Sequence, residues 1–417
     1  MSDPIASPPA RSPGTLIAAR RVITDPERAP LEHGGVLLRD GVVAAVGPAQ
    51  ELERTAGPVD HLEFPLGTVI PGLINAHVHL SFDVTTDPRI ALEAGDLDAV
   101  RATIAANARA ALDGGVTTAR DLGDLAGLVA EFEERAASGS AAGPRVLSAR
   151  SPLTPPGGHC WFLGGEIDTG GGDAERGLRA AVDERAEAGA DVIKIMASGG
   201  DLTPAGAPRW KSQFDERDLA IVVEAAHARG LPVAGHAHGT EAMAQCARAG
   251  VDTIEHGSWQ APSGADGEAR HDLSAEVAEL VAASGAAIVP TRARGWETWP
   301  AEAGLDLQLR KLAWDAEHGI PLVAGNDAGV GVGYFDDLVD TLTLFAAAGW
   351  SPQQALATAT TRAAAALGRA DHIGRLDVGH SADLVVLDAD PLADLRALKA
   401  VRLVVVRGRQ HLPTAAS

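Results

Sequence analysis

Short apolar runs alternate with longer amphipathic segments through the middle of the chain. Between the runs lie Ala-rich segments with helical periodicity, such as 96–115 and 174–190. Strands that read as nearly continuous apolar runs are typical of parallel strands buried on both faces. The eight runs are TVIPGLINAHVHL (68–80), GVTTARDLG (115–123), PRVLSARS (144–151), ADVIKIMASGG (190–200), LPVAGHAHG (231–239), VDTIEHGS (251–258), AAIVPT (286–291) and IPLVAGNDAG (320–329). The pattern predicts an α/β fold with a (β/α)8 TIM-like barrel over residues 68–370.

The two ends of the chain have a different pattern. Residues 14–67 and 371–412 contain short apolar strands separated by turn signals, such as Arg39-Asp40-Gly41. We expect these two segments to form one small β-sandwich domain beside the barrel. Near the end of the barrel, Ser351 followed by Pro352 predicts the start of a helix.

The composition excludes several classes of function. The 417 residues carry a net charge of −21, and a surface that acidic repels nucleic acid and anionic lipid. No apolar stretch is long enough to span a membrane without charges, and the Pro- and Ser-rich first 15 residues do not have the apolar core of a signal peptide. The two cysteines, Cys160 and Cys246, form no disulfide framework. We expect a cytoplasmic protein with no nucleic-acid or membrane partner.

Histidines gather at the ends of the predicted strands, where barrels of this type place their functional groups. The first strand ends in His77 and His79, the fifth in His236, the sixth in His256 and the eighth in Asp327. His77 and His79 share one face because alternate strand residues do. On its own, such a pair of histidines can also be two hydrogen-bonded polar residues at the edge of a sheet, with no metal. Four of only 14 histidines at three strand ends favour a metal site.

Lys194 lies within the apolar fourth strand, between Ile193 and Ile195. A buried, unpaired ammonium is costly, so the lysine either pairs with a carboxylate or has a lowered pKa. In the second case the free amine can react with carbon dioxide, and the resulting carbamate can bridge two cations.

The ligand types then predict a centre with two divalent metal ions. We expect His77, His79 and Asp327 on one ion, His236 and His256 on the other, and the Lys194 carbamate on both. Imidazole and oxygen ligands without thiolate suit zinc, with manganese or cobalt as alternatives.

Several of these motifs resemble a known family. HVH after an apolar strand, the fourth-strand lysine, HAHG, EHG and GNDAG occur in the order typical of the amidohydrolase superfamily with a binuclear metal centre. GVTTARDLG is similar to the second strand of that family, and GRLDVGHSADLVVLDADPL to its returning β segment. TPPGGHCW (154–161) and residues 197–219 most resemble the imidazolonepropionase-related branch, which includes prolidase-like and carboxypeptidase-like enzymes.

The resemblance also bears on single residues. It implies that His159 lies near the substrate, and His238 is expected either to face the substrate or to support the site. Single-zinc deaminases of the superfamily usually lack the carbamylated lysine and carry a glutamate three residues after the fifth-strand histidine. Here that position is Gly239. Hydrolysis with two metal ions is therefore favoured over nucleobase deamination.

The expected reaction is hydrolysis of an amide bond by a hydroxide that bridges the two metal ions, in a peptide or an N-acyl amino acid. Asp327 would act as base and then as acid, and His159 would donate a hydrogen bond to the substrate carbonyl. Among the mouth-loop residues, Arg292 is predicted to bind a substrate carboxylate, and Tyr334 to contact the substrate. Tryptophans on the same loops are compatible with packing alone.

Three alternatives stay open from the sequence. The enzyme could open a cyclic amide of the lactam type, or tailor a peptide in natural-product biosynthesis. The protein could also be a non-enzymatic scaffold with a structural metal, although a structural site needs neither a base nor an open position. A homo-oligomer is compatible with the sequence.

Overall fold

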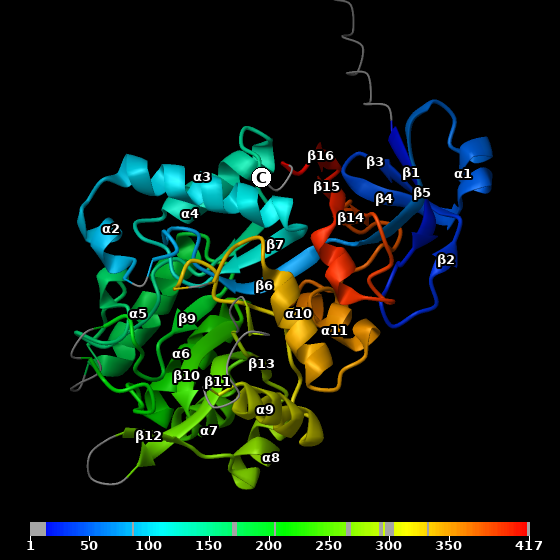
Figure 1. Ribbon diagram of the computed structural model, residues 1–417. Helices are drawn as coiled ribbons and strands as arrows, with labels where there is room; N and C mark the ends of the chain where they lie inside the picture. The colour runs from blue at the N-terminus through cyan, green and yellow to red at the C-terminus, as the bar shows by residue number, and fades with distance from the viewer. Residues whose placement is uncertain are drawn as a thin grey trace, which may run out of the picture.

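The computed structural model describes residues 14–85, 87–168, 173–203, 206–263, 268–291, 295–296, 304–331 and 333–414. The chain has a mixed α/β fold, in which a β-rich part lies beside a larger part where helices surround shorter strands (Figure 1). In the described part, none of the helices is long and apolar enough to cross a membrane.

Strands from both ends of the chain share one eight-stranded sheet. Its order is β16–β15–β14–β5–β1–β3–β4, with β2 paired to β1. The predicted turn after Arg39 joins β3 to β4, and Asp40 and Gly41 both have positive φ angles. The strands are β1 (Gly14–Val22), β2 (Leu31–Glu32), β3 (Gly34–Arg39), β4 (Val42–Pro48), β5 (Val59–Pro71), β14 (Leu384–Leu387), β15 (Val401–Val406) and β16 (Arg409–His411). The short helix α1 (Ala49–Thr55) packs on this sheet, and η4 (Leu395–Lys399) precedes β15.

The middle of the chain forms two parallel groups of strands. One has the order β6–β7–β8, and the other β9–β10–β11, with β13 parallel to β11 and β12 antiparallel to it. The strands are β6 (Leu73–Val78), β7 (Val116–Asp121), β8 (Arg145–Ser148), β9 (Ile193–Ile195), β10 (Val233–Gly239), β11 (Thr253–Ser263), β12 (Glu268–His271) and β13 (Ala287–Val289). Single parallel bridges connect the groups: Leu153 with Ile195, Ile288 with Leu322, and Val78 with Ala328.

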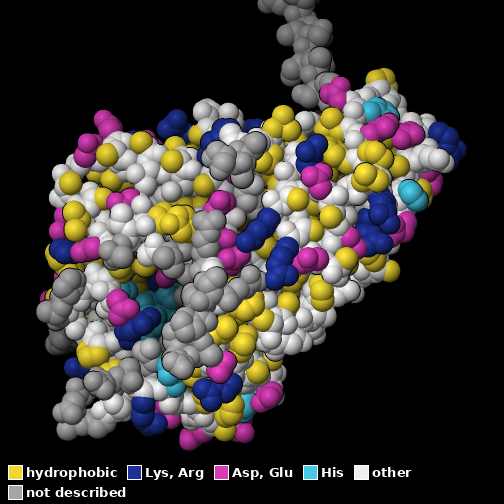
Figure 2. All heavy atoms as spheres, viewed as in Figure 1, with side chains coloured by type: hydrophobic (Ala, Val, Ile, Leu, Met, Phe, Trp, Pro, Cys, Tyr) yellow, Lys and Arg dark blue, Asp and Glu magenta, His cyan; other side chains and the backbone are white. Residues whose placement is uncertain are grey.

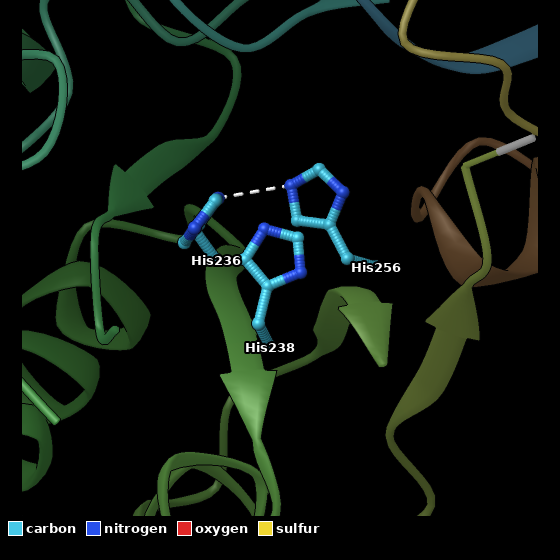
Figure 3. A group of neighbouring side chains, drawn as sticks. All are labelled: His236, His238 and His256. Atoms are coloured by element: carbon cyan, nitrogen blue, oxygen red, sulfur yellow. Dashed lines mark hydrogen bonds between the residues drawn. The ribbon is translucent and has the colours of Figure 1, made fainter. Parts of the chain in front are cut away.

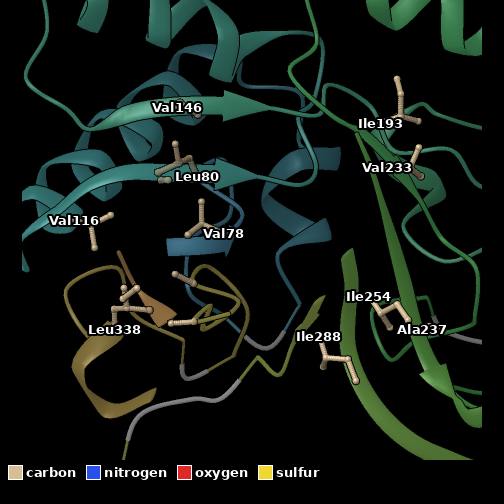
Figure 4. Close-up of a cluster of buried hydrophobic side chains, with 14 of the residues drawn as sticks. Val78, Leu80, Val116, Val146, Ile193, Val233, Ala237, Ile254, Ile288 and Leu338 are labelled. Atoms are coloured by element: carbon tan, nitrogen blue, oxygen red, sulfur yellow. The ribbon is translucent and has the colours of Figure 1, made fainter. Parts of the chain in front are cut away.

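Helices follow the strands and cover their outer side. They are α2 (Arg89–Glu93), α3 (Leu97–Asp113), α4 (Leu128–Ser138), α5 (Ala174–Glu187), α6 (Glu216–Ala228), α7 (Thr240–Ala249), α8 (Ala275–Ser284), α9 (Leu305–Glu317), α10 (Leu338–Ala347), α11 (Pro352–Thr358) and α12 (Thr361–Ala366), with the 3-10 turn η1 (Trp161–Leu163). A continuous apolar core, which includes Val78, Val116, Ile193, Val233 and Ile254, joins the strands to these helices (Figure 4). Burying this core is the main driving force for folding.

The eighth predicted strand, 320–329, has no continuous ladder. Its isolated bridges to neighbouring strands lie at Leu322 and Ala328, and a few further backbone hydrogen bonds join it to β6 and β13, such as Ala76 N–H to the carbonyl of Ala324 (3.0 Å). Ala324 donates its N–H to the carbonyl of Thr358 in α11 rather than to a strand (3.0 Å). Asp327 has a φ of +54°, which also interrupts regular strand geometry. The predicted barrel and β-sandwich, and the boundaries between them, stay predictions at this level of detail.

Candidate metal centre

The strand ends bring the predicted side chains to one cavity. It has a volume of about 300 Å³, and its wall includes all six predicted metal ligands: His77, His79, Lys194, His236, His256 and Asp327. His159 and His238 line it as well. Figure 2 shows histidine side chains inside a hollow on the left, with basic and acidic side chains at its edge.

One group of potential ligands consists of His77, His79 and Asp327. The Nε2 atoms of both histidines lie 3.3 Å from Oδ1 of Asp327. Burial lowers the pKa of His77 to about 4, and the nearby Lys194 charge adds to this effect. The imidazole is therefore neutral at neutral pH, the form that binds metals.

A buried carboxylate sets the orientation of His77. Nδ1 of His77 hydrogen-bonds to Oε2 of Glu255 (2.8 Å), and the other oxygen of Glu255 accepts from Arg120 (2.8 Å) and from Thr253 (2.7 Å). With its proton on Nδ1, neutral His77 directs a lone pair from Nε2 at Asp327. Two electron-rich atoms 3.3 Å apart would repel each other unless a cation lay between them.

The second group consists of three histidines, His236, His238 and His256, whose ligand atoms lie within 4.8 Å of one another. Figure 3 shows the three rings close together, with His236 and His238 from β10 and His256 from β11. Nδ1 of His236 lies 2.9 Å from Nε2 of His256. Burial lowers the pKa of all three imidazoles well below the usual value, and neighbouring imidazoles add to the effect. The structure therefore places His238 with the predicted ligands His236 and His256.

Hydroxyl groups and a carbonyl hold these rings. Nδ1 of His256 hydrogen-bonds to Thr291 (2.7 Å), Nδ1 of His238 to Ser258 (2.8 Å), and Nε2 of His236 donates to the carbonyl of Gly199 (3.1 Å). Each ring thus has one nitrogen held by a hydroxyl or a carbonyl group. The second nitrogens of His236 and His256 face each other across 2.9 Å.

Lys194 is buried, with 1% of its surface exposed, and lines the same cavity as both groups of ligands. In the part of the chain that the structure describes, no carboxylate forms an ion pair with it. Burial lowers the pKa of Lys194 to about 8, although Glu255 and Asp327 raise it. These observations disfavour the carboxylate-paired alternative for this lysine.

His159 faces the same cavity from the loop after β8. Its ring centroid lies 4.5 Å from that of His236, and burial lowers its pKa to about 3. A Cβ atom on Gly200 would lie 2.4 Å from this ring, so the glycine leaves the space that the imidazole occupies.

The two remaining predicted residues have different positions. Arg292 lies outside the described residues. The Tyr334 side chain is 39% exposed and does not belong to the described wall of the cavity, although its carbonyl accepts a hydrogen bond from Asn326 (2.8 Å). Among the mouth residues, Arg209 does line the cavity.

The residues present fit divalent cations. Oδ1 of Asp327, Nδ1 of His79 and Nδ1 of His159 are buried and have no hydrogen-bond partner among the described residues. Such atoms are costly unless a ligand satisfies them. Asp327 and His256 also have positive φ angles, +54° and +72°, and strain of this kind gathers at functional sites. The donor set, imidazole nitrogens and carboxylate oxygens without thiolate, suits zinc and similar ions.

Two residues of the site were missed in the sequence. Glu255 directly precedes His256, and Arg120 lies in the second apolar strand. Both are charged residues in strands that are otherwise buried, the same signal that identified Lys194. Their opposite charges could have identified them as a pair.

Comparisons with known proteins agree on the family. The model of the amidohydrolase family matches residues 68–410. An ochratoxinase from Aspergillus niger is 26% identical over 411 residues, which cover 90% of this chain and 81% of that protein.

Solved structures are also similar. A Xaa-Pro dipeptidase with bound methionine in the active site has a TM-score of 0.78 and 25% identity, covering 96% of this chain and all of the other. A prolidase complexed with N-methylphosphonate-L-proline has a TM-score of 0.77 and 26% identity, with the same coverage. The chain therefore belongs to the amidohydrolase family and is a hydrolase that acts on carbon–nitrogen bonds.

Proposed function

We propose that the protein hydrolyses an amide bond in a peptide or an N-acyl amino acid that carries a free carboxylate. The observation that carries this proposal is the convergence of two ligand groups, His77–His79–Asp327 and His236–His238–His256, on one cavity beside Lys194. The dipeptidase and prolidase among the similar structures support a peptide-like substrate.

We further propose that the parallel strands form a (β/α)8 barrel, with the site at their carboxyl ends. His77, His79 and Asp327 would hold one divalent ion, and His236 and His256 a second, with His238 as a further ligand or a substrate contact. When bound, two such ions lower the pKa of water and polarise the substrate carbonyl. The donor set favours zinc.

Lys194 is proposed to react with carbon dioxide. Its amine nitrogen attacks the carbon of carbon dioxide, one proton is released, and the product is a carbamate with two anionic oxygen ligands. The buried amine has no carboxylate partner in the described part and a lowered pKa, both of which favour this reaction.

The protein side chains would carry the proton transfers. Asp327 accepts a proton from the attacking water and then donates it to the leaving nitrogen. The imidazole of His159 donates a hydrogen bond to the substrate carbonyl oxygen as negative charge develops there. Burial alone would raise the pKa of Asp327, but His77 and His79 hold it well below its usual range, so the side chain is an ionised carboxylate at neutral pH.

The substitution Asp327→Asn tests the role of this residue. We expect the variant to fold and to retain metal through the remaining ligands, while kcat falls by at least about 10³-fold because the base is lost. Elemental analysis and a panel of dipeptides and N-acyl amino acids provide the measurements. Wild-type turnover in the variant would contradict the role of Asp327. A wild-type protein that binds no metal or hydrolyses no amide would contradict the proposed function.

The substitution Lys194→Ala tests the carbamate. We expect activity to fall by at least about 10²-fold because a bridging anion is lost. Short carboxylic acids, which can occupy the vacated space, should restore part of it. Full activity with two bound metals in the absence of the lysine would contradict the bridge.

A further inference from the structure

Arg209 lies on a turn at the mouth of the cavity. Its side chain is 41% exposed, and Nη1 lies 3.3 Å from Oδ2 of Asp201, which also lines the cavity. Within the described wall of the cavity, Arg209 and the buried Lys194 are the only lysine or arginine side chains. Arg209 is therefore the exposed cation of this described wall.

Hydrogen bonds hold the turn on the strand ends. The N–H of Lys211 donates to the carbonyl of Pro208 (2.9 Å), and the N–H of Gly199 donates to the carbonyl of Lys211 (3.0 Å). Ser198 and Ser212 form an antiparallel bridge beside them. The backbone at Arg209 thus belongs to a hydrogen-bonded hairpin.

Close packing at two glycines fixes the same turn. A Cβ atom on Gly199 would lie 2.0 Å from the carbonyl oxygen of Ala207, and one on Gly239 would lie 2.2 Å from that of Trp210. The backbone on both sides of Arg209 therefore lies directly against the segments that follow Lys194 in β9 and His238 in β10. The turn itself then needs no ordering when Arg209 binds a ligand, which lowers the entropy cost of binding.

The guanidinium has unused hydrogen-bonding capacity. Nε of Arg209 is buried and has no hydrogen-bond partner among the described residues. Its recorded ion pair is the contact with Asp201, whose side chain is 69% exposed. A well-hydrated carboxylate of this kind is easily exchanged for another. The planar guanidinium can bind a substrate carboxylate through two parallel hydrogen bonds.

Arg209 and the histidines line the same cavity, which has a volume of about 300 Å³. In a cavity of this size, a guanidinium at the mouth can bind one end of a small substrate whose amide lies at the histidines.

We propose that Arg209 determines specificity by binding the substrate carboxylate, and that Asp201 occupies this position when no substrate is bound. This inference rests on the proposed function and names the residue that recognises the free carboxylate of its substrate. The apolar cavity residues Met196, Leu202 and Val330 suit an apolar side chain beside that carboxylate. The sequence had favoured Arg292 for this role.

Equilibrium binding tests the inference independently of turnover. The proposed function predicts turnover of N-acyl amino acids, so every protein in this comparison carries Asp327→Asn, and "wild type" means this background without a further substitution. The zinc-loaded proteins are titrated calorimetrically with N-acetyl-L-phenylalanine and with its amide, N-acetyl-L-phenylalaninamide. We expect wild type to bind the acid about tenfold more tightly than the amide, because the charge-assisted pair forms only with the acid. In Arg209→Ala this preference should fall to about twofold or less. In Asp201→Asn, acid binding should strengthen because the competing carboxylate is gone.

Lys211→Ala is the matched control. It removes the same charge from the same turn, but Lys211 is not part of the described cavity wall. We expect it to keep the wild-type preference for the acid. An unchanged preference in Arg209→Ala, an equal loss in both variants, or no acid preference in wild type would overturn the inference. Acid binding through Arg209, with no amide hydrolysis by the protein that retains Asp327, would overturn the proposed function alone.

Discussion

Single residues beneath the cavity determine how His77 is oriented. Glu255 is fully buried and contacts His77, Arg120 and Thr253. Burial alone would raise the pKa of Glu255, but the Arg120 guanidinium and His77 together lower it to about 2. The residue is therefore an anion that fixes the tautomer of a proposed metal ligand.

The substitution Glu255→Gln tests this positioning role. We expect metal affinity, measured by chelator competition, to fall about 10–100-fold because His77 loses its anionic partner. The melting temperature should also fall, since Arg120 loses its counter-charge. Glu276→Gln, on the exposed first turn of α8, is the control and should change neither quantity. Unchanged metal affinity in Glu255→Gln would show that Glu255 serves only to neutralise Arg120.

At the residue scale, the sequence predicted much of the site. His77, His79, Lys194 and Asp327 could be identified because polar residues at the ends of apolar strands are costly without a function. The grouping of His238 with His236 could not be identified, because it depends on where β10 ends. In the structure β10 extends through Gly239, so His238 lies inside the strand on the same side as His236.

Among the elements, the segment that follows β9 shapes the site most directly. Gly200 leaves space for the His159 ring, and residues 197–213 carry Arg209. The sequence identified this segment only by resemblance, because its conformation depends on contacts with strands far along the chain.

The substitution Gly200→Ala should displace His159. A Cβ atom 2.4 Å from the ring forces the imidazole to move, so we expect kcat/KM to fall by about tenfold or more with metal content unchanged. The control is Gly177→Ala in α5, where a Cβ atom meets nothing within 4 Å. It should stabilise the protein by about 0.5–1 kcal/mol, because alanine favours the helix, without changing activity. Full activity in Gly200→Ala would contradict a substrate role for His159.

In the helix at Ser351, local sequence signals determine the start, and contacts with distant residues determine the end. Its start is confirmed: Ser351 and Gln354 form a capping box, with Pro352 at the first position. After this start, the segment forms two short helices, α11 and α12, instead of one. At the break, the carbonyls of Thr358 and Ala359 accept N–H groups from Ala324 and Ile74, so strand contacts replace helical ones. Those partners cannot be read from the helix sequence.

At the scale of the whole molecule, the apolar and polar pattern predicted the α/β class and the order of strands and helices. The irregular 320–329 segment was not foreseen, because Val323 and Ala324 look like ordinary strand residues. Their hydrogen bonds are decided by where β6, β13 and α11 lie.

The sheet built from both ends of the chain has a consequence for biosynthesis. β5 pairs with β14, so Pro71 lies opposite Leu384. The chain is translated at about 5–20 residues per second, so this edge of β5 stays unpaired for tens of seconds before β14 is synthesised. During that interval an open, apolar strand leads directly into the segment that bears His77 and His79. An unpaired strand edge of this kind can pair with other chains, so β14 protects β5 only once nearly the whole chain has been made.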